Sequence, residues 1–394
     1  LARLAGLDVR VLALVQIERL RGDALGAARD ASAAGVPIIP FSILALAGAE
    51  LIVDALFGTG LEREVTGPGR EAIRAINAQE TPVLALDLPS GLHADTGAVL
   101  GEAVRATATI TFIGLKQGLF TAQGPSCCGD LHFADLEVPE DIYPALHPAS
   151  WRYAGDDLPK LLPRRPRSAH KGQFGHVLVI GGDLGLAGAA RLAGEAAARC
   201  GAGLVSVATR AAHAGLQAAA RPELMFQGIE QAEALAPLLD RASVIAIGPG
   251  LGRGDWGRLM LRAALSSDLP LVVDADALNL LAVAPEFRDN WILTPHPGEA
   301  ARLLKMTPSE VEADRFTAVE ELALRFGGVA VLKGAGSLIA SRGEGQVALC
   351  TAGNPGMAST GWLYLPASCA SGTQCKLHVV LHGCQQSTDK IGDK

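Results

Sequence analysis

Short apolar runs that end in glycines or charged residues recur along this chain, and they restrict its fold more than any other feature. Apolar runs of four to six residues alternating with Ala-rich helical stretches are typical of buried strands in a parallel sheet. Four such endings lie in the second half: Asp274-Ala-Asp276-Ala-Leu-Asn279, Thr294-Pro-His296-Pro-Gly-Glu299, Lys333-Gly-Ala-Gly336 and Asn354-Pro-Gly-Met-Ala-Ser359. Since open α/β sheets bind ligands at the carboxyl ends of their strands, the pattern predicts a binding site there.

The alternation of strands and helices predicts an α/β protein with two domains, each three-layered with a mostly parallel sheet. In the first domain we expect strands at 9–15, 50–56, 82–86 and 107–112, and a helix over 70–77. In the second we expect strands at 176–180, 204–208, 244–247, 271–273, 291–293 and 329–332, and helices over 187–200, 256–265 and 308–326. A stretch with three prolines and four basic residues, Leu158 to Arg167, marks a boundary. The expected division is 1–150, a linker at 151–169, a second domain at 170–360, and a tail at 361–394.

Composition excludes several classes of partner. With 34 Lys and Arg against 41 Asp and Glu the net charge is -7, which gives no electrostatic case for nucleic acid. The longest apolar stretch, 36–49, contains two prolines and is too short to span a bilayer, so we expect no membrane partner. Four scattered cysteines indicate a cytoplasmic protein, whereas three in the last 26 residues resemble secretory usage. They are Cys127, Cys128, Cys200 and Cys350, and then Cys369, Cys375 and Cys384.

Two strand ends carry candidate site residues in the first domain. Asp54-Ala-Leu-Phe-Gly58-Thr59-Gly60-Leu61-Glu62-Arg63-Glu64 follows one strand, and its glycines let the backbone approach an anion. Asp87-Leu-Pro-Ser90-Gly follows another. Asp54, Asp87 and Ser90 would converge as oxygen donors for a cation or as an acid/base pair. Each Asp is equally suited to capping a helix.

These segments, with Ile110-Thr-Phe-Ile-Gly-Leu-Lys-Gln-Gly-Leu-Phe-Thr121, resemble the NAD(P)H-hydrate epimerase domain. That family has a Rossmann-like fold, interconverts the R and S hydrates of NADH and NADPH, and binds potassium. The resemblance implies that Asp54 and Ser90 are K⁺ ligands, that Gly58 to Glu64 contact the hydrated nucleotide, and that Asp87 contacts it as the catalytic residue. The family's Asn-Asn-Gly-Gly-Asp-Gly loop, expected just before Leu1, does not occur in this sequence, so an N-terminal truncation is expected.

Glycine turns and isolated polar residues mark the second domain. Gly181-Gly-Asp183, Gly185-Leu-Ala187-Gly188 and Gly248-Pro-Gly250-Leu-Gly252 permit close ligand approach, or serve only to reverse the chain. His296, between two prolines, suits holding an imidazole toward a ligand, although structural histidines are more common. Asp274 and Asp276 would orient a substrate or Mg²⁺, or cap a helix beginning at Ala277. Lys333 to Ser337 has the composition of a phosphate-binding turn or of a plain connection between strands.

From about 170 to 359 these motifs are similar, in order, to the ADP-dependent NAD(P)H-hydrate dehydratase domain, which has the ribokinase-like fold. The resemblance implies phosphorylation of the S hydrate by ADP with Mg²⁺, followed by loss of phosphate to give NAD(P)H and AMP. It implies substrate contacts from Ala187, Gly250, Gly252 and His296. It also implies contacts to ADP from Lys333, Gly334, Ala335, Gly336 and Ser337. The expected partners are therefore hydrated NADH or NADPH and ADP, and a homo-oligomer is left open.

The sequence departs from this family after Ser359. The family's Gly-Gly-x-Gly-Asp turn, whose Asp acts as base, does not follow, so we expect the dehydratase to be truncated and impaired. Instead, Gly361 to Cys369 and Leu377 to Gln385 resemble the start of a polyhydroxybutyrate depolymerase or related esterase, without a Gly-x-Ser-x-Gly turn. Alternative hypotheses are a nucleotide-binding relic without chemistry and a small-molecule kinase of the ribokinase-like fold.

Overall fold

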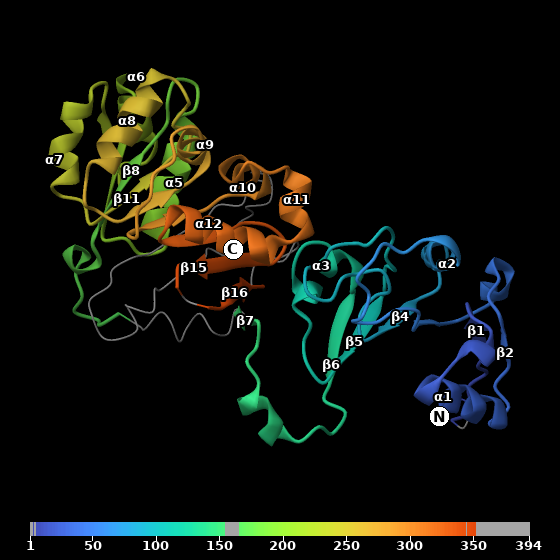
Figure 1. Cartoon of the computed structure of the whole chain (residues 1–394). Coiled ribbons are helices and arrows are strands. Elements are labelled where there is room, and N and C mark those ends of the chain that lie inside the picture. Colours follow the sequence, from blue (N-terminus) through green and yellow to red (C-terminus); the bar gives the residue numbers. More distant parts are fainter. Residues whose placement is uncertain (1–2, 4, 154–164, 344, 352–394) are drawn as a thin grey trace. The chain divides into compact units, whose positions relative to one another are not determined.

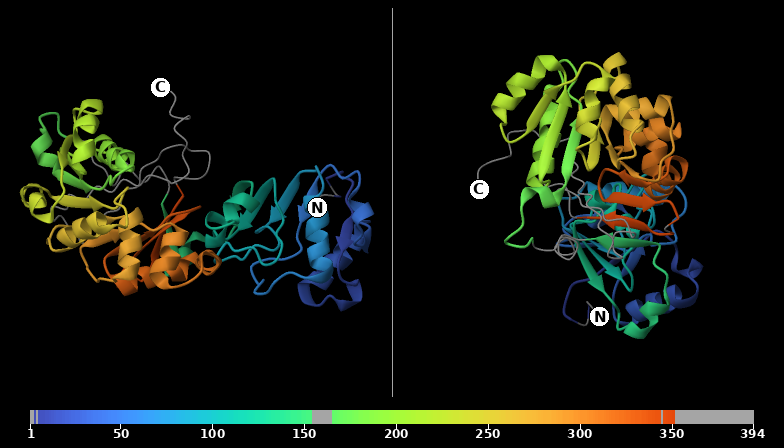
Figure 2. Two further views of the ribbon diagram at one scale, coloured as in Figure 1. Left: turned by 90° about the horizontal axis from the view of Figure 1, so that it is seen from above. Right: turned by 90° about the vertical axis from the view of Figure 1, so that its left-hand side faces the viewer.

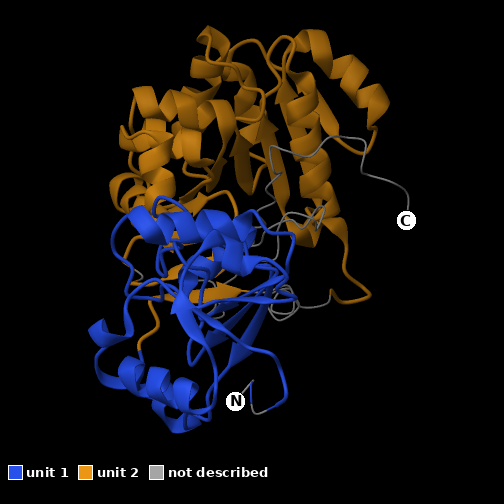
Figure 3. Ribbon diagram, turned by 90° about the vertical axis from the view of Figure 1, so that its right-hand side faces the viewer, with its two compact units in different colours: residues 1–146 blue, residues 147–394 orange. Residues whose placement is uncertain are grey.

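The chain divides into two compact units, residues 1–146 and 147–394 (Figure 3). The computed structural model describes residues 3, 5–153, 165–343 and 345–351. The Asn354–Ser359 motif and the esterase-like tail at 361–394 lie outside the described residues. None of the helices within the described ranges has the length and apolar character needed to cross a bilayer.

The first unit contains two parallel sheets (Figure 1). The smaller pairs β1 (Val11–Ala13) with β2 (Ile38–Pro40), which α1 (Gly22–Ala33) connects. The larger has the order β3 (Ile52–Asp54), β4 (Val83–Leu86), β5 (Ala108–Phe112) and β6 (Asp130–Ala134). Two helices follow its strands, α2 (Gly67–Asn77) and α3 (Gly124–Cys127). Ile73 and Ile76 of α2 pack with Ile52 and Val83, and this apolar contact holds α2 against the first residues of β3 and β4.

The second unit is built on one ten-stranded sheet, and two further views show its arrangement (Figure 2). Its order is β10 (Met225–Gly228), β9 (Leu204–Thr209), β8 (His176–Ile180), β11 (Val244–Ile247), β12 (Leu271–Val273), β13 (Trp291–Leu293), β14 (Val329–Leu332), β15 (Ser337–Ser341), β16 (Val347–Cys350) and β7 (Ser150–Tyr153). All neighbours from β10 to β14 are parallel, and β15 is antiparallel to β14 and β16. The carboxyl ends of seven strands therefore meet at one edge.

Helices connect these strands and bury their apolar side chains. They are α5 (Ala187–Arg199), α6 (Ala211–Ala220), α7 (Ala236–Leu239), α8 (Asp255–Leu265), α9 (Ala275–Val283), α10 (Pro297–Leu304), α11 (Pro308–Ala313) and α12 (Arg315–Phe326). Ala190 of α5 packs against Val177 and Val179 of β8 and against Val205 and Val207 of β9. Such small residues let a helix lie close to a sheet, which fixes the loop between β8 and α5 at the carboxyl edge.

The α/β class with mostly parallel sheets is confirmed, and several local predictions need correction. The single helix expected over 308–326 is two helices, because the Asp314 side chain accepts a hydrogen bond from Thr317 N at 3.0 Å and begins a new helix. Residues 151–153, assigned to a linker, lie in β7, whose backbone pairs with β16. The strand expected over 9–15 has only three residues, Val11–Ala13, since its partner β2 is equally short.

Candidate functional site

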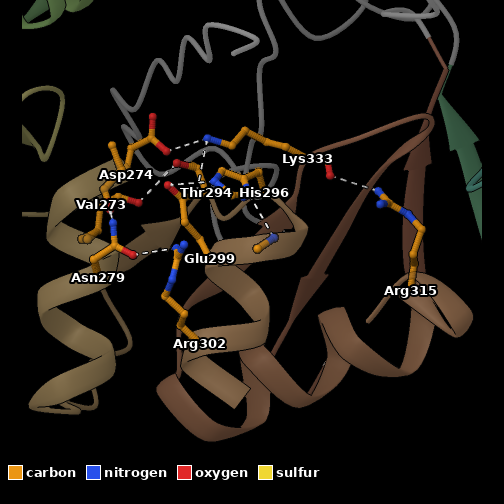
Figure 4. Close-up of polar contacts among 11 residues, drawn as sticks. Val273, Asp274, Asn279, Thr294, His296, Glu299, Arg302, Arg315 and Lys333 are labelled. Atoms are coloured by element: carbon orange, nitrogen blue, oxygen red, sulfur yellow. Dashed lines mark hydrogen bonds and ion pairs between the residues drawn. The ribbon is translucent and has the colours of Figure 1, made fainter. Parts of the chain in front are cut away.

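Four side chains from neighbouring strand ends gather at the carboxyl edge of the second sheet, and we call them the edge cluster: Asp274, His296, Glu299 and Lys333 (Figure 4). Asp274 follows β12, His296 and Glu299 follow β13, and Lys333 follows β14. Lys333 Nζ lies 2.6 Å from Asp274 Oδ1 and 3.9 Å from Glu299 Oε2. One ammonium thus lies between two carboxylates, which leaves the edge cluster with a net negative charge when His296 is neutral.

His296 is both a helix cap and a member of the edge cluster. Its Nδ1 accepts a hydrogen bond from Gly298 N at 2.9 Å, and its own backbone N donates to Glu299 Oε2 at 2.9 Å, so the two residues form a capping box at the start of α10. Because Nδ1 is an acceptor, the neutral ring carries its proton on Nε2, which lies 3.5 Å from Glu299 Oε1. The side chain is 40% exposed, so a ligand can reach part of the ring.

The two aspartates after β12 do not cap α9 as the sequence allowed. Asp274 is the N-cap residue, but its side chain makes no capping hydrogen bond and pairs with Lys333 instead. Asp276 Oδ2 accepts a hydrogen bond from Gly252 N at 3.0 Å, and α9 begins at Ala275 rather than at Ala277. Ala275 has φ of 50°, a left-handed conformation that costs energy for a residue with a side chain. Such strain beside charged groups is common at binding sites.

The glycine turns after β8 and β11 lie against each other at the same edge. Asp183 N donates to Gly250 O at 2.7 Å, and Gly182 N donates to Pro249 O at 3.2 Å. A Cβ on Gly252 would lie 2.6 Å from Asp183 Oδ2, and Gly252 has φ of 71°, so only glycine fits there. Ala187 is the first residue of α5. The carbonyl oxygen of the preceding residue, Leu186, lies 2.6 Å from the position that a Cβ on Gly250 would occupy, so the two loops are in contact. The structure therefore brings together the loops that carry Ala187, Gly250 and Gly252.

Arg315 contacts the buried side of the loop of residues 333–336, which joins β14 to β15. Arg315 is 1% exposed, and its Nη2 lies 3.3 Å, 3.2 Å and 3.4 Å from the carbonyl oxygens of Leu332, Lys333 and Gly336. Its Nη1 lies 3.0 Å from Glu312 Oε1. Burial lowers the pKa of the Arg315 guanidinium, and Glu312 opposes that shift. Sequence reasoning missed Arg315, because the carbonyl groups that it contacts lie 17 to 21 residues away.

In the first unit, Asp54 and Ser90 lie together at the ends of β3 and β4. Asp54 is 1% exposed; its Oδ1 accepts from Ser90 Oγ at 2.6 Å and its Oδ2 from Ser90 N at 2.8 Å. Leu56 N also donates to Asp54 Oδ1, at 3.2 Å. Burial raises the pKa of Asp54, and the hydrogen bonds from Ser90 and Leu56 oppose that shift. In the described part of the chain no Lys, Arg or His forms an ion pair with Asp54, so a bound cation would compensate its charge.

Asp87 contacts Lys116, a residue to which sequence reasoning gave no role. Lys116 Nζ donates to Asp87 Oδ1 and, at 2.8 Å, to Phe112 O. Asp87 also accepts from Phe112 N at 3.2 Å and has φ of 70°. Neither Asp54 nor Asp87 is the N-cap of a described helix, so the helix-capping alternative is wrong for both. Its position four residues after the end of β5 could have identified Lys116 as a candidate site residue.

The loop of residues 58–64 is open to solvent. A Cβ added to Gly58 or to Gly60 would meet no atom within 4 Å, so local packing does not require glycine at either site. Glu62 Oε2 lies 3.5 Å from His93 Nε2, which ties this loop to the segment after Ser90. No group of three or more His, Cys, Asp or Glu side chains suited to a metal occurs among the residues that the structure describes.

Comparison with known proteins places both units in one family. Residues 177–362 match the family model described as NAD(P)H-hydrate dehydratase, and residues 1–118 match that of the YjeF-related protein N-terminus. The bifunctional NAD(P)H-hydrate repair enzyme Nnr of Coxiella burnetii is 49% identical over 364 residues, which cover 92% of this chain and 74% of that protein. The chain belongs to the bifunctional NAD(P)H-hydrate repair enzymes. The Escherichia coli repair enzyme is 43% identical over 362 residues, covering 92% of this chain and 70% of that protein.

The family match confirms the resemblance drawn from the strand-end motifs. Both family models fall on the segments that carry those motifs, and the dehydratase match ends at 362, close to the point where the sequence departs from the repair-enzyme pattern. A ribokinase-like protein from Enterococcus faecalis superimposes with a TM-score of 0.49 at 30% identity, covering 54% of this chain and 76% of that one. The fold assignment rests on the strand order and on the repair-enzyme relatives.

Proposed function

We propose that the second unit binds S-hydrated NADH or NADPH together with ADP at the carboxyl edge of its sheet, and dehydrates the hydrate at the expense of ADP. The observation that carries this proposal is the edge cluster, in which Lys333 lies between Asp274 and Glu299 beside the partly exposed ring of His296. A charged, strained and partly buried cluster at the ends of parallel strands is the arrangement expected of a binding site.

Each loop at the edge has a separate role in this proposal. Ala187, Gly250, Gly252 and His296 contact the hydrate, and residues 333–337 contact ADP. Asp274 is partly exposed and supplies a carboxylate oxygen of the kind that Mg²⁺ prefers. Mg²⁺ held there would neutralise negative charge on the transferring phosphate. Lys333 supplies a positive charge at the same place, and Asp274 fixes its direction.

The first unit is proposed to interconvert the R and S hydrates. Asp87 is the catalytic residue, and Lys116 holds its carboxylate in one orientation. Residues 58–64 contact the hydrated nucleotide from the exposed loop after β3. Asp54 and Ser90 hold K⁺, because a buried carboxylate with a raised pKa gains most from a bound cation. We place the protein in the cytoplasm, where reduced thiols such as the buried Cys127 and Cys350 persist.

The experiment is regeneration of NADH from S-hydrated NADH by the purified full chain with ADP and Mg²⁺, beside the E. coli repair enzyme. NADH, AMP and phosphate are each quantified. We expect turnover well below that of the E. coli enzyme, because residues 360–394 contain no Gly-Gly-x-Gly-Asp turn to supply the base. Turnover equal to the E. coli enzyme would contradict that role of the turn.

The same assay distinguishes the proposed dehydratase from two other functions. A nucleotide-binding relic binds ADP and the hydrate but forms no NADH in any reaction time, and the departure from the family pattern after Ser359 favours this alternative. A small-molecule kinase transfers phosphate to an added alcohol and leaves hydrated NADH unchanged. The absence of any binding of ADP or hydrate would contradict the proposed function itself.

A further inference from the structure

A buried guanidinium organises the loop at 333–336 from the side opposite to solvent. Arg315 is the first residue of α12, and its Nη2 lies 3.2 Å to 3.4 Å from three carbonyl oxygens, those of Leu332, Lys333 and Gly336. Figure 4 shows the contact with Lys333. A cation at the N-terminus of a helix is unfavourable for the helix dipole, and burial of a charge is costly. Arg315 is therefore in a position that does not favour α12, and its contacts instead favour one conformation of the loop.

The backbone geometry shows what that conformation presents to solvent. The C=O of one residue and the N–H of the next point in opposite directions in a trans peptide unit. Because the Lys333 carbonyl points at Arg315, the Gly334 N–H points away from it, toward the exposed side of the loop. A Cβ on Gly334 would lie 2.6 Å from Arg315 Nη1, and Gly334 has φ of 146°, so only glycine brings the backbone this close.

We infer that Arg315 is a positioning residue for ADP: by holding the carbonyls of this loop on its buried side, it fixes the Gly334 amide outward as a hydrogen-bond donor for the nucleotide. This inference rests on the proposed function, which assigns residues 333–337 to ADP. Arg315 does not touch the ligand. It lowers the cost of binding because the loop is already in the bound conformation before ADP arrives.

The same helix offers a matched control. Arg325, in the last turn of α12, donates from Nη1 to the carbonyl oxygens of Leu303 and Leu304 at 3.4 Å and 3.1 Å, at the end of α10. Arg315→Met and Arg325→Met each remove a guanidinium that binds carbonyls, but only the first one lies under the loop. Both variants are made in the full chain, and circular dichroism establishes that each is folded.

The experiment measures the Kd of ADP and, separately, the Kd of S-hydrated NADH by calorimetry with Mg²⁺ present. We expect Arg315→Met to raise the Kd of ADP by about tenfold or more while the Kd of the hydrate changes less than about twofold. Arg325→Met should leave both unchanged, and Arg315→Lys should restore part of the ADP affinity because lysine still donates to carbonyls. A merely structural role would weaken both ligands together.

Three results would overturn the inference. One is a folded Arg315→Met chain that binds ADP as the wild type does, and another is equal loss of ADP and hydrate. If Arg315→Met does not fold, Gly334→Ala is used instead, because the added methyl group pushes the guanidinium away from the loop. The third contradicting result is normal ADP binding by Gly334→Ala. A wild-type chain that binds no ADP refutes the proposed function as well, which separates the two failures.

Discussion

Lys333 and Asp274 join the ends of two strands that are not neighbours: their side chains meet at 2.6 Å across β13, which lies between β12 and β14. Fifty-nine residues separate them in the chain. Lys333 is also held at its backbone, where its N–H donates to Pro295 O at 2.8 Å. Three consecutive strand ends are thereby fixed to one another, which restricts the motion of the edge cluster before any ligand binds.

Glu299 should stabilise the second unit chiefly through its capping bond. Glu299→Ala removes the acceptor of the His296 N–H at a site 6% exposed, and we expect a loss of about 1–3 kcal/mol. Glu299→Gln keeps an oxygen acceptor and should lose less than half as much. Urea unfolding followed by Trp fluorescence checks this, because all four Trp residues, at 151, 256, 291 and 362, lie in the second unit. Equal losses in the two variants would assign the effect to charge instead.

Potassium should stabilise the first unit through Asp54. Burial raises the pKa of Asp54 in the folded state above 3.8. Without K⁺, the contribution of Asp54 to the free energy of unfolding is therefore fully present below pH 3.8 and is lost as the pH rises through the pKa of the folded state. At neutral pH, K⁺ in place of a large organic cation should therefore slow unfolding of this unit. The readout is alkylation of the buried Cys127 and Cys128 in urea, mapped by mass spectrometry.

Asp54→Asn is the control for that prediction. An amide of the same shape has no charge to bury, so both the K⁺ effect and the part of the pH dependence due to Asp54 should disappear. Wild-type and Asp54→Asn chains that respond equally to K⁺ would place the cation elsewhere.

The cysteines should differ strongly in reactivity. Burial raises the pKa of Cys128 to about 12, so near pH 8 only roughly one thiol in 10⁴ is ionised. Cys200 is exposed and should react first with iodoacetamide, whereas Cys127, Cys128 and Cys350 are buried. Peptide mapping of the native chain over time checks the order. Early labelling of Cys128 would contradict the burial of its side chain, which is 2% exposed.

A catalytic turn placed after Ser359 should restore turnover. Replacing the residues after Ser359 with the family's Gly-Gly-x-Gly-Asp segment and its continuation should raise dehydratase turnover by several orders of magnitude, because the Asp supplies a base and the amides an anion site. The control carries the same segment with Asn in place of that Asp. An equally active Asn control would show that another group acts as base.

The sequence predicted central strands well and tertiary contacts poorly. β8, β11, β12, β13 and β14 were predicted to the residue, because short apolar runs bounded by polar residues or glycines are typical of strands buried on both faces. β10 and β7, the strands at the two edges of the sheet, were missed because exposed edge strands need no such run, whereas β15 and β16 were missed although most of their residues are buried. The break at Asp314 depends on one side-chain cap. Asp274, His296 and Lys333 were identified as candidates, but nothing local reveals that Lys333 pairs with Asp274.

The central claim is that the edge cluster is part of the site that binds the nucleotide substrates, and calorimetric titration with ADP and Mg²⁺ tests it most directly, because Lys333 belongs to the loop assigned to ADP. The wild-type full chain is compared with Lys333→Met and with Lys171→Met, which removes an exposed lysine elsewhere in the same unit. We predict that the wild type and Lys171→Met bind alike and that Lys333→Met binds about tenfold or more weakly, since it leaves Asp274 and Glu299 without their cation. Equal binding by all three chains, or no binding by the wild type, would contradict the account.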